Sequence, residues 1–232
     1  MPSIILEGDF TFTVFHPIWG VFTPLNFFTV PLNIPNPLPG PSSLFSKRIS
    51  RPRHIPRYGT PDFILSTSDP YEIEKSEKII FPGVGSFQYV SKIIEPIRDL
   101  LMERIKSGVP YLGICLGLEI LFESSEEGPG NGLGIFNGTV KKFSGVKTPH
   151  MGWNTVNVKS PSKIMEGIQN NSFFYFMHSY YAPENQYTVM ETEYGNKFAS
   201  GIEMGNIYGV QFHPEKSGEN GIRILKNFGV IS

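Results

Sequence analysis

The chain has 232 residues, 20 basic and 21 acidic side chains and a formal net charge of −1. This length allows one α/β domain with a sizeable core, and the balanced charge gives no indication of a nucleic-acid or membrane partner. A single cysteine excludes an intramolecular disulfide framework and fits a reducing, cytoplasmic setting.

Residues 1–60 differ in composition from the rest of the chain. Ten prolines fall between positions 17 and 61, and no acidic residue occurs between Phe10 and Pro61. Such proline density argues against a long helix or a central strand. We interpret residues 1–60 as a proline-rich extension, disordered or mistranslated; the basic stretch at 47–57 leaves an organelle transit segment as the alternative.

From Asp62 the sequence alternates strand and helix patterns. In chain order we expect a strand at 63–65, a short helix opening at Asp69, a buried strand at 78–81, a helix over 87–106 and a buried strand at 109–114. Such alternation predicts a parallel sheet with helices on both faces.

The second half of the chain carries a series of short strand patterns separated by Gly, Pro, Asn and Ser. These candidates lie at 136–143, 154–158, 173–177, 188–192, 199–203 and 207–211. Some are expected to pair antiparallel, which makes the sheet mixed, and residues 221–228 are expected to form a closing helix.

Residues 109–119 read V-P-Y-L-G-I-C-L-G-L-E and contain the only cysteine, Cys115. An apolar strand precedes it, a helix is expected from Leu116 through Phe122, and Gly113 and Gly117 flank it. This spacing predicts a nucleophile elbow, a sharp turn that exposes one side chain above a sheet. The N-terminus of the following helix is expected to point at the sulfur and so to favour the thiolate form of Cys115. A buried structural cysteine is the alternative.

His213 is the histidine best placed to assist such a nucleophile. It follows an apolar strand pattern in G-V-Q-F-H-P-E, and Glu215 falls two residues later, on the same side of an extended backbone. Cysteine hydrolases need a base and a group that orients the base. The alternative is a loop histidine beside a solvated carboxylate.

The G-I-C-L-G stretch at 113–117 and the Q-F-H-P-E stretch at 211–215 resemble the class I (triad) glutamine amidotransferases. P-H-M-G-W-N at 149–154, with the stretches at 174–180 and 213–218, narrows the resemblance to the glutaminase subunits of imidazole glycerol phosphate synthases. The resemblance implies a flavodoxin-like α/β fold for residues 61–232, with a mixed, mainly parallel sheet.

The resemblance also implies site residues. Cys115 would form a γ-glutamyl thioester with glutamine, His213 would act as base and then acid, and Glu215 would orient His213. The implied substrate-binding and oxyanion positions are Gly83, Val84, Gly85, Leu116, Glu119, His178, Ser179 and Tyr180.

The implied partner is a separate (β/α)8-barrel cyclase subunit, which forms a heterodimer with the glutaminase and uses the ammonia in histidine biosynthesis. Trp153 and Lys216 match positions at that interface. A buried tryptophan and a solvated lysine are the alternatives. The resemblance implies no metal and no organic cofactor.

The chain departs from the family pattern in two places. The first strand, with its D-Y-G-x-G-N loop and the helix after it, has no match, although residues 3–6 could be a remnant strand. Without that strand, apolar edges of its neighbours would be exposed. Glu119 stands where the family has glutamine, and on a helix it would face the substrate and raise the KM for glutamine.

Two other functions remain open from the sequence. One is another triad amidotransferase, such as the glutaminase of pyridoxal phosphate synthesis, which the P-H-M-G-W-N stretch disfavours. The other is a catalytically impaired interaction partner of the cyclase.

Overall fold

A computed structural model describes residues 69–83 and 85–231, together with short strands at 5–6, 10–11, 27–29 and 65–67. The expectations for the rest of residues 1–60, and for Val84, lie outside the described residues. In the described part of the chain, no helix combines the length and the apolar composition needed to cross a membrane.

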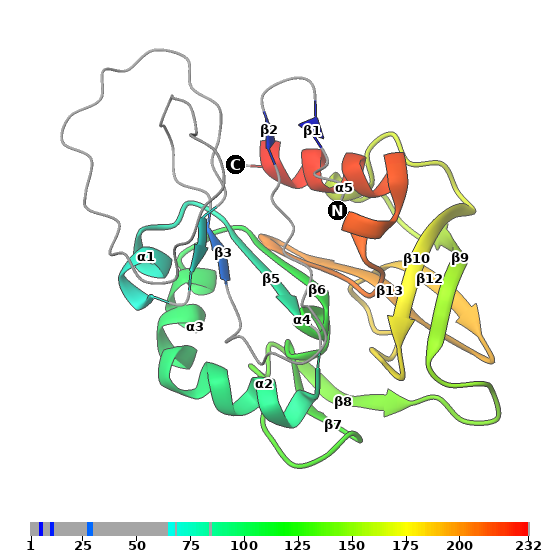
Figure 1. Ribbon diagram of the computed structural model, residues 1–232, viewed down its shortest axis with the longest axis horizontal. Helices are drawn as coiled ribbons and strands as arrows, with labels where there is room; N and C mark the ends of the chain where they lie inside the picture. Colours follow the sequence, from blue (N-terminus) through cyan, green and yellow to red (C-terminus); the bar gives the residue numbers. More distant parts are fainter. Residues whose placement is uncertain are drawn as a thin grey trace, which may run out of the picture.

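The described chain forms five α-helices and fourteen strands (Figure 1). The helices are α1 (Pro70–Lys75), α2 (Phe87–Ile94), α3 (Arg98–Lys106), α4 (Leu116–Glu119) and α5 (Gly218–Val230). The first strands are β1 (Ile5–Leu6), β2 (Phe10–Thr11), β3 (Phe27–Thr29), β4 (Leu65–Thr67), β5 (Ile79–Gly83), β6 (Tyr111–Cys115) and β7 (Phe122–Ser125). The remaining strands are β8 (Phe136–Lys142), β9 (His150–Val158), β10 (Ser172–His178), β11 (Tyr180–Tyr181), β12 (Thr188–Tyr194), β13 (Asn196–Met204) and β14 (Ile207–Val210).

Nine of these strands form one mixed sheet in the order β10-β9-β12-β13-β14-β6-β5-β3-β4. Strands β14, β6 and β5 run parallel to one another, and the other neighbours pair antiparallel. A smaller sheet has the order β11-β8-β7. The sheet is mixed, as expected, with two parallel and six antiparallel pairings among the described strands, and its parallel strands end at one edge.

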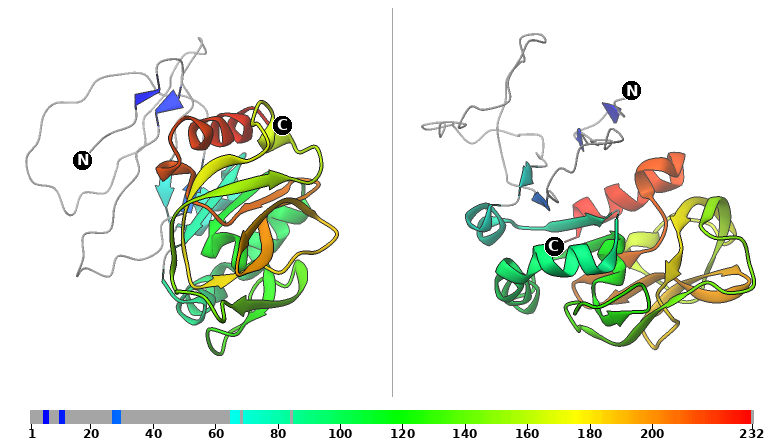
Figure 2. Two further views of the ribbon diagram at one scale, coloured as in Figure 1. Left: turned by 90° about the vertical axis from the view of Figure 1, so that its right-hand side faces the viewer. Right: turned by 60° about the horizontal axis from the view of Figure 1, so that its bottom comes forward.

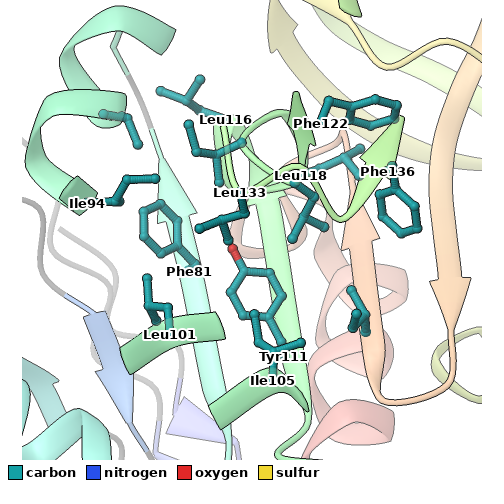
Figure 3. Packing of buried hydrophobic residues seen from close by; sticks show 14 of the residues in the cluster. Phe81, Ile94, Leu101, Ile105, Tyr111, Leu116, Leu118, Phe122, Leu133 and Phe136 are labelled. Carbon is teal, nitrogen blue, oxygen red and sulfur yellow. The ribbon is translucent and has the colours of Figure 1, made fainter. Parts of the chain in front are cut away.

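Helices cover both faces of the main sheet, which confirms the expectation (Figures 1 and 2). Strand β6 is buried throughout, and its first two side chains enter different clusters. Tyr111 packs in a cluster with residues of α2 and α3, including Ile94 and Leu101 (Figure 3). Leu112 packs in a second cluster with residues of α5, including Phe228. The strand that leads to Cys115 is therefore held on both sides.

The expected bounds of two helices are wrong. The helix expected over 87–106 is divided into α2 and α3 by a 3₁₀ turn at Glu95–Ile97, because Pro96 has no N–H to continue the α-helical ladder. The elbow helix ends at Glu119 rather than Phe122. The returning chain explains this end, since the N–H groups of Leu133 and Ile135 bond to the carbonyls of the two residues after Glu119.

The exposed edge expected beside β5 is paired. Strand β3 lies between β5 and β4, antiparallel to both, with Phe28 opposite Ile80. The backbone groups of an open edge accept any extended segment, so this pairing needs no family motif. The suggestion that residues 3–6 are a remnant of the missing strand is wrong, because β1 pairs with β2 in a separate two-stranded sheet.

Candidate active site

Cys115 occupies a sharp turn at the carboxyl end of β6, with φ 54° and ψ −110°. This left-handed conformation is strained for a residue with a side chain and is typical of a nucleophile elbow. The flanking glycines allow α4 to approach the sheet. A Cβ atom at Gly113 would lie 2.2 Å from the carbonyl oxygen of Gly117, and one at Gly117 would lie 1.8 Å from that of Phe81. The predicted elbow is confirmed.

The thiol of Cys115 is buried, and burial raises its pKa well above the usual value. The carboxyl groups of Glu119 and Glu215 raise this pKa further. A hydrogen bond from the backbone N–H of Leu116 and one from Gln211 oppose the increase but do not outweigh it. The N–H at the start of α4 therefore favours the thiolate as expected, but burial and the two carboxyl groups outweigh its effect on the Cys115 pKa.

His213 lies beside this edge because it follows β14, the parallel neighbour of β6. Its Nδ1–H donates to Oε1 of Glu215 at 2.8 Å. Burial raises the pKa of Glu215, but the hydrogen bond and charge of His213, together with a backbone hydrogen bond and the charge of Lys216, lower it by more. Nε2 of His213 is buried and has no hydrogen-bond partner among the described residues. With the proton on Nδ1, this nitrogen carries the lone pair of a base.

Two of the positions predicted for the oxyanion, Gly83 and Leu116, lie beside the nucleophile. Gly83 is opposite Cys115 in the β5–β6 register, and the N–H of Leu116 bonds to the sulfur. A Cβ atom at Gly83 would lie 2.8 Å from Cβ of Leu116, so only glycine allows this approach. Gly85 has φ 129°, a conformation that favours glycine. The oxyanion role of these groups stays a prediction.

Glu119 is buried, and burial raises its pKa to about 8. Nε2 of Gln211 donates to Oε1 of Glu119 at 2.8 Å and lies 4.0 Å from Sγ of Cys115. Sequence reasoning gave Gln211 no role. The signal was its place in the Q-F-H-P-E stretch, two residues before His213 and therefore on the same side of an extended backbone.

The predicted glutamine-binding segment lies at the end of β10. The carbonyl oxygen of Met177 is 3.9 Å from Sγ of Cys115, so the residues that follow it are beside the nucleophile. His178 is buried, and its Nδ1 bonds to the carbonyl oxygen of Tyr180 at 2.7 Å. The carbonyl oxygen of Ser179 accepts the N–H of Phe143 at 3.2 Å. This placement agrees with the predicted site, and the binding role stays a prediction.

Trp153 and Lys216 both lie against Tyr175. Trp153 is 55% exposed, so the buried-tryptophan alternative is wrong, and its ring meets that of Tyr175 edge-on with centroids 6.0 Å apart. The Lys216 amine is 5.7 Å from the Tyr175 ring centroid. Met151 and Phe173, 59% and 56% exposed, alternate with buried residues on the same two strands. We call Met151, Trp153, Phe173 and Tyr175 the β9–β10 apolar patch.

Tyr175 also connects this patch to His213. The backbone N–H of His213 donates to the carbonyl oxygen of Tyr175 at 2.8 Å. The Tyr175 N–H donates to Oγ of Ser217, which in turn donates to the carbonyl oxygen of His213. Among the residues that the structure describes, no group of three or more His, Cys, Asp or Glu is placed to hold a metal ion.

Comparison with known proteins places this site in a family. The family model described as glutamine amidotransferase class-I matches residues 57–231. Imidazole glycerol phosphate synthase subunit HisH of Picrophilus torridus is 54% identical over 166 residues, covering 72% of this chain and 88% of that protein. The protein of the same name from Thermococcus kodakarensis is 53% identical over 169 residues, covering 70% and 87%.

Solved structures show the same fold. A crystal structure of a glutamine amidotransferase has a TM-score of 0.55 and 17% identity, covering 72% of this chain and 88% of that chain. The structure of a putative GMP synthase component from Thermoplasma acidophilum has a TM-score of 0.51 and 20% identity, covering 69% and 75%.

Proposed function

Because this chain belongs to the class I glutamine amidotransferases, we propose that it is the glutaminase subunit of an imidazole glycerol phosphate synthase, acting in histidine biosynthesis in the cytoplasm. The observation that carries the proposal is the identity of 54% with a HisH protein across 88% of its length, combined with an intact Cys115 elbow. Residues 61–232 form the amidotransferase domain in this proposal.

The reaction begins with attack by the Cys115 sulfur on the carboxamide carbon of glutamine. Nε2 of His213 takes the thiol proton and passes it to the leaving nitrogen, which departs as ammonia and leaves a γ-glutamyl thioester. Water then attacks the thioester and gives a proton to His213; the C–S bond breaks, glutamate is released, and His213 returns the proton to the Cys115 sulfur. Glu215 holds His213 with its lone pair toward the site and stabilises the imidazolium.

The raised pKa of the Cys115 thiol supports a proton transfer that accompanies attack. A buried thiolate would be costly without a nearby cation, so the sulfur stays protonated until a base accepts its proton. His213 is the base that fits, since its Nε2 has no other partner among the described residues. The N–H of Leu116 and a backbone donor near Gly85 would bind the oxyanion that forms.

The ammonia passes to a cyclase subunit that docks on the β9–β10 apolar patch and Lys216. Ammonia released into open water would be protonated and lost as a nucleophile, which makes a covered exit necessary. An exposed cluster of aromatic and Met side chains with a cation at its rim is typical of a protein–protein interface. The cyclase is the (β/α)8-barrel subunit implied by the family resemblance.

The test is glutamate release by the purified chain, with and without the cyclase subunit of a HisH-containing relative such as Thermococcus kodakarensis. We expect a complex, faster glutamine hydrolysis within it, and formation of imidazole glycerol phosphate from glutamine and the phosphoribulosyl substrate. Trp153→Ala should weaken the complex without altering the far-UV circular dichroism of the isolated chain.

Two outcomes would contradict the proposal and favour an alternative. Complex formation without glutamine hydrolysis under any condition would identify a catalytically impaired partner. Glutamine hydrolysis without any binding to the cyclase would identify another triad amidotransferase.

A further inference from the structure

Two buried histidines that the proposed mechanism does not use form a hydrogen-bond chain beside the nucleophile. Nδ1 of His178 bonds to the carbonyl oxygen of Tyr180 at 2.7 Å, and Nε2 of His178 lies 3.0 Å from Nδ1 of His150. Nε2 of His150 lies 3.2 Å from Nδ2 of Asn154. The side chains of all three residues are thus joined end to end.

The donors and acceptors of this hydrogen-bond chain have only one consistent arrangement. A carbonyl oxygen only accepts, so Nδ1 of His178 carries its proton and Nε2 must accept. Nδ1 of His150 is then the donor to His178, and Nε2 of His150 accepts from Asn154. Both histidines are therefore neutral Nδ1–H tautomers, and protonation of the second nitrogen on either ring would place two donors against each other.

Backbone groups also fix the other end of the hydrogen-bond chain, at Asn154. Nδ2 of Asn154 also donates to the carbonyl oxygen of Glu193 at 3.0 Å, while its Oδ1 accepts the N–H of Thr155 at 2.8 Å. These two contacts determine which end of the amide faces His150. Asn154 therefore presents a donor to His150, in agreement with the arrangement required at the Tyr180 end.

Aromatic side chains hold the two imidazole rings in place. The ring of His150 is stacked between Tyr194 and Phe176, with centroids 4.0 Å and 4.8 Å away. Phe198 packs edge-on against His178 at 5.3 Å. Burial lowers the pKa of His150 to about 4 and that of His178 to about 3, so both rings are neutral near pH 7.

We propose that His178 and His150 are positioning residues that hold the backbone of residues 178–180 in the shape that receives glutamine. This segment follows Met177, whose carbonyl oxygen lies 3.9 Å from Sγ of Cys115, so its first residue is next to the site of attack. His178 closes the segment by bonding to Tyr180, and His150 holds His178 in the tautomer that can make this bond. The proposal rests on glutamine being the substrate.

The first test compares two variants that each keep one nitrogen of the imidazole. His178→Asn keeps a donor near the position of Nδ1, whereas His178→Gln places its amide near Nε2, where the amide oxygen can accept from His150, and keeps no donor toward Tyr180. Losing one hydrogen bond in the site should raise the KM of His178→Gln for glutamine about tenfold, with kcat within about twofold. His178→Asn should recover most of that loss.

A second pair tests the indirect role of His150. His150→Asn keeps a donor toward His178, and His150→Leu keeps none. The KM for glutamine should rise several-fold more in His150→Leu than in His150→Asn. Alkylation of Cys115 by iodoacetamide should proceed at the wild-type rate in both, because this reagent does not use the glutamine site. Equal KM values within each pair, or a loss confined to kcat, would overturn the proposal.

A spectroscopic measurement on the unmodified protein covers the case in which the variants do not fold. The ¹⁵N chemical shifts of labelled histidine should show His178 and His150 as Nδ1–H tautomers, whereas free imidazole side chains favour the other tautomer. Finding either residue with its proton on Nε2 would overturn the proposal. This result does not depend on substrate, whereas absence of glutamine hydrolysis in the wild-type protein would overturn the proposed function instead.

Discussion

The histidine of the triad and the histidines of the buried chain lie in neighbouring parts of one fold but differ in how their nitrogens are used. His213 has one nitrogen bonded to Glu215 and one that is buried without a partner among the described residues. His178 and His150 have both nitrogens bonded, and no lone pair is left over. A buried nitrogen without a partner costs free energy, so its presence marks the group that acts on substrate. Full hydrogen bonding of both nitrogens is typical of histidines that hold neighbouring backbone in place, as we propose for His178 and His150.

The strongest test of this difference is to make the same substitution at His213 and at His178. His213→Asn keeps a donor toward Glu215 but removes the nitrogen that serves as base, and kcat should fall on the order of 10⁵-fold or more. His178→Asn keeps the nitrogen that matters there and should be far milder. Steady-state glutamate release by the complex with the cyclase measures both, with Cys115→Ala as the floor. Similar losses in the two variants would remove the distinction.

The next largest effect concerns the orientation of His213. In Glu215→Gln the amide can donate to Nδ1, which favours the tautomer whose Nε2 is protonated and cannot act as a base. We expect kcat to fall about 10⁴-fold with little change in the KM for glutamine. A matched Glu215→Asp variant keeps the charge and should retain more activity. A loss that appears in KM rather than kcat would place Glu215 in substrate binding.

The buried histidines His150 and His178 should make the stability of the protein sensitive to acid. Burial lowers the pKa of His150 and His178 from 6.5 to about 4 and about 3, so below pH 6.5 the unfolded chain binds protons that the folded chain does not. Their stabilising contribution is therefore full above pH 6.5 and is lost as the pH falls toward 4 and 3. Each group adds up to about 1.4 kcal/mol of unfolding free energy per pH unit in that range.

Urea unfolding between pH 7 and 4.5 measures this slope, with His150→Asn as the variant that keeps the donor and removes one titrating group. In His150→Asn the slope of the unfolding free energy against pH should be smaller, by an amount that corresponds to at most one proton taken up on unfolding. An unchanged slope would show that His150 is already protonated in the folded protein.

The smallest expected effect concerns Glu119. Its folded pKa of about 8 lies above its ordinary 4.5, so its stabilising contribution is present below pH 4.5 and lost as the pH rises through 8. Once ionised it raises the pKa of Cys115. Between pH 7 and 9, Glu119→Gln should therefore alkylate with iodoacetamide several-fold faster than the wild type. It should also have a lower KM for glutamine, and equal values of both quantities would contradict this role.

The local sequence was sufficient for the elbow and for the His213–Glu215 pair. Gly113 and Gly117 each lie two residues from Cys115, and His213 and Glu215 are two residues apart, so short spacing in the sequence predicts this geometry. The raised pKa of Cys115 could not be predicted in this way. It depends on burial and on Glu215, which is distant along the chain.

Contacts between distant segments also explain what else escaped prediction. His150 and His178 are 28 residues apart, and the antiparallel register of β9 and β10 alone places them opposite each other. The antiparallel insertion of β3 depends on an open sheet edge, which no local pattern records. The early end of α4 depends on a chain that returns more than ten residues later.

The two contacts of Tyr175 join the proposed docking patch and the proposed base through a single residue. Its ring lies on the outer patch against Trp153, while its carbonyl oxygen holds the N–H of His213 on the inner side. A docked partner that shifts strand β10 by a fraction of an ångström also shifts the base. Communication between the proposed docking face and the proposed base His213 therefore needs to cross no more than the thickness of one strand.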